Sequence, residues 1–151
     1  SMMNDVERTA FAHASQALCT ANPDIHLHAI TVRKENVQMH IRADGNKLYN
    51  YMIRLSLLGR MRRHPEVLLI PDPRSIKVES GNSLPDYLQT LLWFHLRCET
   101  NLKMQPVESD KSLAIQFTDM LCGAIHFAFE NNNYKYLNIL GTCISHKCLY
   151  F

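Results

Sequence analysis

The chain has 151 residues, of which 46% are hydrophobic and 20% are charged, a composition typical of one globular domain with a real core. The formal net charge of +2 is too small to indicate a nucleic-acid-binding protein by itself, because such proteins usually carry a concentrated basic surface. No apolar run approaches the ~20 residues that a membrane-spanning helix needs, so we expect no membrane partner.

The five cysteines are Cys19, Cys98, Cys122, Cys143 and Cys148. Their number is odd, and no two of them form a Cys-x-x-Cys pair. This pattern supports neither a disulfide framework nor a zinc knuckle. We therefore expect a cytoplasmic protein.

The first predicted elements are a helix and a strand. Residues 4–21 predict an amphipathic helix that ends before the following proline, and its apolar stripe consists of Val6, Ala10, Ala14, Ala17 and Leu18. Residues 25–32 begin with an alternating pattern and become apolar and β-branched, which predicts a strand with a covered face. His26 and His28 share one face of that strand. They either pack there or, with a third ligand, bind a metal.

Residues 37–41 predict a short strand that ends at the turn signal Asp44-Gly45. Residues 46–64 then predict a helix. Basic residues crowd toward its end, namely Arg60, Arg62, Arg63 and His64. Cations there favour the helix dipole, so the cluster is either a solvated face or a contact for phosphates.

Residues 66–70 form a short apolar run between two prolines, which predicts a central strand buried on both faces. Asp72 and Arg74 follow its carboxyl end, where open α/β sheets usually bind ligands. Because an Asp-Pro pair also begins turns, both a binding role and a turn role stay open for Asp72. Residues 75–82 are polar and predict a loop.

A helix is predicted to begin at Ser83, a good N-terminal capping residue, and its apolar stripe extends to Leu102. Trp93 and Phe94 lie partly beside this stripe, where they cover a second surface or a partner. Residues 105–108 predict one short strand before the next helix.

The clearest pattern is a helix over residues 112–130, with apolar residues at intervals of three and four. A narrow polar face consists of Gln116, Asp119, Gly123, His126 and Glu130. Apolar residues flank that face, so we expect Asp119 at the edge of the core, where a carboxylate needs a partner, a metal or a raised pKa. Asp119 therefore has either a functional role or a structural one, as a cap or ion pair to a neighbouring loop.

Residues 134–151 are aromatic, contain cysteines and lack a helical period. This segment is interpreted as a docking arm, an irregular packed end or the product of an altered reading frame. We expect a single domain over residues 1–133 and a C-terminal tail over 134–151. The alternation of helices and strands predicts an α/β layer with a mainly parallel central sheet covered by helices.

Three segments carry a resemblance to a known family. Asp110-Lys111, followed by Ile-Gln-Phe-Thr-Asp-Met-Leu-Cys-Gly-Ala-Ile over 115–125, resembles the C-terminal signature of the DUF3800 family. Leu-Tyr-Asn-Tyr over 48–51 and Leu-Leu-Ile-Pro-Asp-Pro-Arg over 68–74 resemble the family's other two landmarks in the same order. The resemblance covers residues 25–130 and implies an RNase H-like fold. The family normally begins with a strand ending in Asp-Glu-Ser, so we expect the N-terminal strands to be missing here.

The resemblance implies a metal-dependent nuclease that hydrolyses phosphodiesters in nucleic acid. Asp72 and Asp119 are the expected metal carboxylates, with Asp110 and Lys111 as accessory catalytic residues. Hard oxygen ligands suit Mg²⁺ or Mn²⁺. Because the Asp-Glu-Ser carboxylate is missing, the chain as given is expected to be incomplete or inactive.

The alternative function is a non-catalytic protein-interaction or oligomerisation module. A sheet without its N-terminal strand has an unprotected edge, and such edges pair readily with other chains. A homodimer through this edge is therefore expected, with Trp93, Phe94 or the aromatic tail as further contacts.

Overall fold

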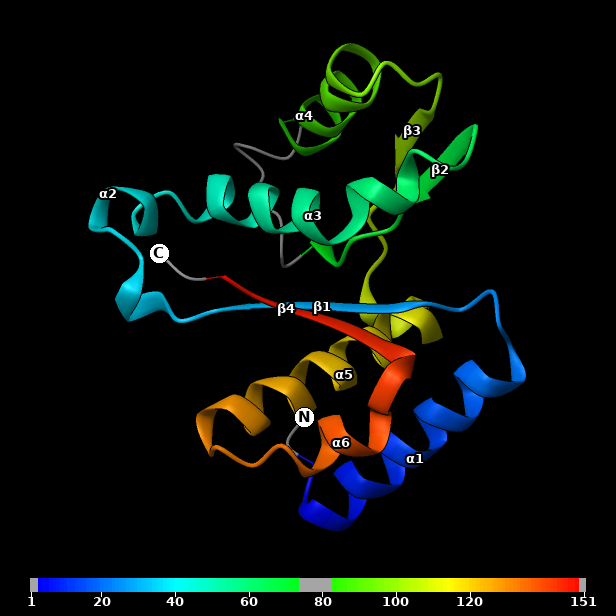
Figure 1. Cartoon of the computed structure of the whole chain (residues 1–151), viewed down its shortest axis with the longest axis vertical. Helices are drawn as coiled ribbons and strands as arrows, with labels where there is room; N and C mark the ends of the chain where they lie inside the picture. Colours follow the sequence, from blue (N-terminus) through cyan, green and yellow to red (C-terminus); the bar gives the residue numbers. More distant parts are fainter. Residues whose placement is uncertain (1–2, 74–82, 150–151) are drawn as a thin grey trace. The chain divides into compact units, whose positions relative to one another are not determined.

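The computed structural model describes residues 3–73 and 83–149 (Figure 1). Arg74 and the loop predicted over 75–82 lie outside these described residues. The chain forms two compact units. Unit 1 takes in the residues up to Ala29 together with Gln116–His146, and unit 2 takes in Ile30–Ile115 and the residues from Lys147 onward.

The predicted α/β class is confirmed, because helices and strands alternate along the chain. The strands do not form one central sheet. In the described part of the chain they make two two-stranded sheets, one of β1 and β4 and the other of β2 and β3. None of the helices in that part has both the length and the apolar content needed to cross a membrane.

Helix α1 (Asp5–Ala21) confirms the first predicted helix. Its start is fixed by Asn4, whose side chain accepts a hydrogen bond from the Glu7 amide at 2.8 Å, while the Glu7 carboxylate accepts one from the Asn4 amide at 3.2 Å. Two otherwise unpaired amides are satisfied in this way. The predicted stripe, however, is the wrong face: its members are exposed, Val6 to 76%. The helix buries Ala12 and packs Phe11 instead, because a large aromatic ring gains more from burial than small alanine side chains do.

Unit 1 is built around α1, α5 (Leu113–Glu130) and α6 (Lys135–Leu140), which Figure 1 shows grouped together. The rings of Phe11 and Phe117 lie 5.3 Å apart between α1 and α5. The buried residues of this core are Ala12, Leu27, Leu121, Ile125, Ala128, Tyr136 and Leu140. The predicted polar face of α5 is confirmed, since all five of its members are exposed.

Residues beyond 134, for which no regular element was predicted, form α6, the short 3-10 helix η6 (Gly141–Cys143) and strand β4 (Ile144–Leu149). Strand β4 pairs with β1 (Leu27–Val32). The turn between α6 and β4 uses Gly141 at φ +57°, a backbone angle that favours glycine.

The strand predicted over residues 37–41 is wrong. The chain there forms the 3-10 helix η1 (Lys34–Asn36) and the short helix α2 (Met39–Arg42). Local bonds such as Val37 N–H to Lys34 C=O at 3.1 Å replace a strand partner. Asp44 does not start a turn; its carboxylate accepts from the Lys47 amide at 3.1 Å and caps the next helix.

Unit 2 places α3 (Gly45–Met61), α4 (Ser83–Thr90) and the π-helical turn η4 (Leu91–His95) around strands β2 (Glu66–Leu69) and β3 (Asn101–Met104). The buried residues of this core are Leu58, Met61, Leu84, Leu88 and Leu92. Strand β2 runs parallel to β3, with Glu66 beside Asn101 and Leu68 beside Lys103. A mainly parallel central sheet was expected, and the parallel pairing found in unit 2 consists of the two short strands β2 and β3.

Burial of the 66–70 strand on both faces is a wrong prediction. Val67 and Leu69 pack against the core, but Leu68 is 52% exposed and Ile70 is 42% exposed. Successive strand residues point to opposite faces, and the unit 2 core covers only one of those faces.

The helix predicted to reach Leu102 ends earlier, and the strand predicted over 105–108 forms four residues sooner as β3. Arg97 takes a left-handed φ of 53°, which ends the helix. The side chain of Gln89 then holds the returning chain: it donates to the Thr100 carbonyl and accepts from the Leu102 amide, each at 2.8 Å.

Candidate functional site

The polar face of α5 lines a cavity in unit 1. Its volume is about 560 Å³, and the lining residues are Met3, Arg8, Gly123, His126, Phe127, Glu130 and Asn131. Three of these belong to the polar face predicted from the sequence. The cavity is the natural first place to look for a ligand site, because concave surfaces bury most of a small ligand.

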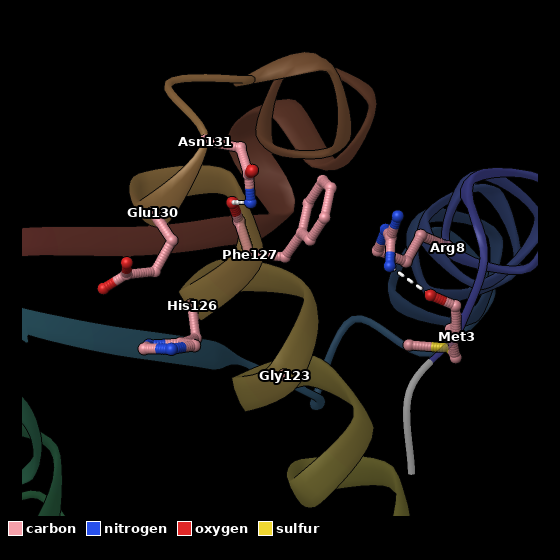
Figure 2. A pocket seen from close by; sticks show the side chains of 7 residues that line it. All are labelled: Met3, Arg8, Gly123, His126, Phe127, Glu130 and Asn131. Carbon is pink, nitrogen blue, oxygen red and sulfur yellow. Dashed lines mark hydrogen bonds between the residues drawn. The ribbon is translucent and has the colours of Figure 1, made fainter.

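Arg8 occupies one wall of this cavity. Its guanidinium lies 3.5 Å from the centre of the Phe127 ring, and its Nε donates to the Tyr136 hydroxyl at 3.1 Å. It also donates to the Met3 carbonyl, as Figure 2 shows. The positive charge of Arg8 is therefore engaged by the protein itself.

The contacts continue beyond Arg8. The Tyr136 hydroxyl donates to the Asp5 carboxylate at 2.5 Å, and Lys135 Nζ lies 3.0 Å from the same carboxylate. The hydrogen bond from Tyr136, followed by that from Lys135, lowers the pKa of Asp5. This chain of contacts ties the start of α1 to α6.

His126 and Glu130 do not converge with Arg8. Figure 2 shows both side chains on the side of α5 away from Arg8, while the Phe127 ring faces the guanidinium. General acid–base chemistry needs groups within hydrogen-bond reach of one reacting atom. Arg8 therefore does not act together with His126 and Glu130 on one atom in this cavity.

Sequence reasoning missed Arg8 and Tyr136. Arg8 stands four residues before Ala12 and three before Phe11, which are the residues that α1 packs inward. An arginine at that spacing on a packed face is the signal that could have indicated an internal partner. Tyr136 lay in the segment for which no helix was predicted.

The four predicted catalytic residues fall in both units. Asp119 belongs to unit 1 and is exposed on α5 beside Cys122. Partial desolvation of the Cys122 thiol raises its pKa, and the negative charge of Asp119 adds to that effect. Asp110 and Lys111 belong to unit 2, where both are exposed in the 3-10 helix η5 (Ser109–Lys111) just before α5.

Asp72 belongs to unit 2 and is half-buried, three residues after the end of β2. Burial raises the pKa of Tyr49, and the nearby charge of Asp72 raises it further. Asp72 therefore lies close enough to the Tyr49 hydroxyl for its negative charge to affect the pKa of that group.

No metal centre is assembled by the described residues. Among them, no group of three or more His, Cys, Asp or Glu side chains is placed to hold an ion. His26 and His28, which stand on either side of the first residue of β1, therefore belong to no such group. Of the metal carboxylates that the family resemblance implies, Asp72 lies in unit 2 and Asp119 in unit 1.

The basic end of α3 is fixed by a buried hydroxyl. Thr100 is only 2% exposed, and its Oγ1 donates to the His64 carbonyl at 2.7 Å. The side chains of Arg62, Arg63 and His64 are exposed. This arrangement agrees with a solvated basic face.

Unit 2 also carries several exposed apolar side chains. Leu68 and Ile70 expose their side chains along β2, and Phe94 in η4 is 75% exposed. Trp93 is 44% exposed, yet its indole Nε1 donates to the Thr100 carbonyl at 2.9 Å and so is held in place. Apolar side chains held exposed on rigid elements are typical of contact surfaces.

Searches against protein-family models, curated proteins and solved structures find no match to this chain.

Proposed function

We propose that this chain is a protein-interaction module in which strand β2 pairs with a second copy of the chain. The observation that supports it is the exposure of Leu68 and Ile70 on a parallel sheet that has two strands in the described part of the chain. A two-stranded sheet is marginal by itself. The backbone groups of an edge strand form a template for a further strand, and apolar side chains beside it add to the gain from pairing.

The charges favour β2 over β3 as the pairing edge. The outward residue in the middle of β3 is Lys103, and lysine on an edge strand opposes association. The corresponding residue of β2 is Leu68. In an antiparallel pairing centred on Leu68, this leucine meets its own copy, while Glu66 meets Ile70. No like charges then stand opposite one another.

The proposal is tested by placing a charge at the centre of the edge. Leu68→Lys should weaken self-association at least tenfold, which corresponds to about 1.4 kcal/mol. Leu113→Lys is the matched control, because Leu113 is 83% exposed on α5 and lies outside the sheet. Light scattering coupled to size-exclusion chromatography gives the masses. Equal self-association of both variants, or a monomeric unmodified chain, contradicts the proposal.

A second candidate is divalent-metal-dependent hydrolysis of nucleic acid, as the DUF3800 resemblance implies. The observation that favours it is the position of Asp72, just past the carboxyl end of β2 in a parallel pair, where α/β sheets usually bind ligands. Since the described residues gather no metal cluster, no catalytic step is assigned to Mg²⁺ or Mn²⁺.

Manganese calorimetry tests this second candidate. Asp72→Asn and Asp119→Asn are measured separately, because the two carboxylates belong to different units. Asp24→Asn is the control, an exposed aspartate in the turn after α1. Micromolar binding that only the first two variants lose would support the nuclease function, and no binding to the unmodified chain would overturn it for this chain.

A further inference from the structure

Two cysteines from distant parts of the sequence lie together in unit 1. Cys19 is near the end of α1, and Cys143 ends η6 just before β4. Both are free thiols and half-buried, and both pack against the same core. Burial raises the pKa of the Cys143 thiol, and the neighbouring Cys19 side chain raises it further.

Both cysteines line one cavity in unit 1. Its volume is about 400 Å³, and its lining includes Cys19, Cys143, Thr20, His26 and Thr142. An oxidant as small as hydrogen peroxide fits easily into such a space. The two side chains are therefore neighbours on the wall of a space that a small reagent can enter, and a disulfide needs both proximity and access.

We propose that Cys19 and Cys143 are a redox-active pair that closes to an intramolecular disulfide when a peroxide enters this cavity. The reaction needs the peroxide as oxidant. The Cys19 sulfur, as thiolate, attacks one peroxide oxygen; the O–O bond breaks, Cys19 becomes a sulfenic acid, and hydroxide leaves. The sulfur of Cys143 then attacks the Cys19 sulfur, the S–S bond forms, and the sulfenic oxygen leaves as water. In sum, two thiols and one hydrogen peroxide give one disulfide and two waters.

The surroundings of Cys143 set the order of the two steps. Burial, followed by the neighbouring Cys19, raises the pKa of the Cys143 thiol, which lowers its share of nucleophilic thiolate. The first attack on the peroxide is therefore assigned to Cys19, and Cys143 loses its proton as it attacks the sulfenic acid in the second step. The bond would join the end of α1 to the segment that leads into β4. Because it closes a long loop, it should also restrict the unfolded chain and stabilise unit 1.

Peptide mapping gives a direct test on the full-length chain. Trypsin separates the two cysteines, since Cys19 falls in residues 9–33 and Cys143 in residues 136–147. After one equivalent of hydrogen peroxide and blocking of free thiols, these two peptides should be recovered as one linked species that dithiothreitol separates. Replacing either residue, as Cys19→Ser or Cys143→Ser, should abolish it.

Cys122→Ser is the matched control, because Cys122 is exposed and lies in a different tryptic peptide. It should leave the linked species unchanged. In Cys143→Ser, a sulfenic acid on Cys19 should become trappable by dimedone, which a merely structural thiol would not show. The proposal is overturned if both thiols stay alkylatable under peroxide that oxidises Cys122, or if Cys19 links to another cysteine instead.

Discussion

The guanidinium of Arg8 lies 3.5 Å from the centre of the Phe127 ring, and Arg8 Nε donates to the Tyr136 hydroxyl at 3.1 Å. One side chain of α1 thus contacts both α5 and α6 within unit 1. A planar cation can stack on a ring and donate in its own plane at the same time, which an ammonium group cannot do. Arg8 is therefore a structural link in the unit.

Arg8→Lys should lower the free energy of unfolding by about 1–2 kcal/mol, because the stacking on Phe127 and the hydrogen bond to Tyr136 are both lost. Urea denaturation followed by circular dichroism measures this change. Arg33→Lys is the control, since the Arg33–Glu35 pair is exposed and 3.7 Å long, and its replacement should be nearly neutral. Equal effects of the two variants would contradict the structural role given to Arg8.

The contacts of Asp5 predict a pH dependence. Its pKa is lowered in the folded protein, first by the Tyr136 hydrogen bond and then by Lys135, so ionised Asp5 stabilises the fold. That contribution is fully present above the unfolded pKa of about 3.9 and is lost as the pH falls through the lower folded value.

Thermal unfolding between pH 2 and pH 6 checks this sign. Asp5→Asn should unfold at a lower temperature than the unmodified chain at pH 6, and the difference should shrink toward pH 2. Asp24→Asn serves as the comparison. A difference that grows as the pH falls would mean that the charge of Asp5 opposes folding.

The buried hydroxyl of Thr100 predicts a stability effect in unit 2. Thr100→Val keeps the shape of the side chain but leaves the His64 carbonyl without its 2.7 Å donor. We expect a loss of about 1–3 kcal/mol in the free energy of unfolding. The same change at Thr90, an exposed residue at the end of α4, should have little effect. If the two substitutions are equivalent, Thr100 is not what fixes the end of α3.

The elements predicted correctly are those whose patterns are local. Helices α1, α3 and α5 carry long periodic stretches, which need no knowledge of distant parts of the chain. Strand β1 was likewise indicated by its β-branched run. The buried face of α1 could not be predicted from the sequence of the helix alone, because it depends on the rings of Phe117 and Phe127, which pack near it.

The elements missed are those fixed by distant partners. The apolar spacing of Leu102 suits a helix, but the Gln89 side chain holds that residue in β3 through two hydrogen bonds that span the turn. Strand β4 pairs with β1, more than a hundred residues earlier, so no local pattern indicates it. The exposure of Leu68 was missed because an apolar strand run does not reveal how many strands will cover it.

The expected metal carboxylates were chosen by their positions at the ends of elements. Asp72 does follow β2, and Asp119 does lie on the polar face of α5. Whether such residues meet depends on the arrangement of whole elements, which spacing along the chain does not encode. Nuclease function therefore stays a prediction.

Sedimentation equilibrium of the unmodified chain over a hundredfold range of concentration tests the central proposal most directly. Pairing through β2 predicts that the average mass rises with concentration to twice that of the chain and goes no further, because a two-fold contact closes on itself. A mass that stays at that of one chain up to the highest concentration would contradict self-pairing. A mass that rises without limit would show association through some other surface.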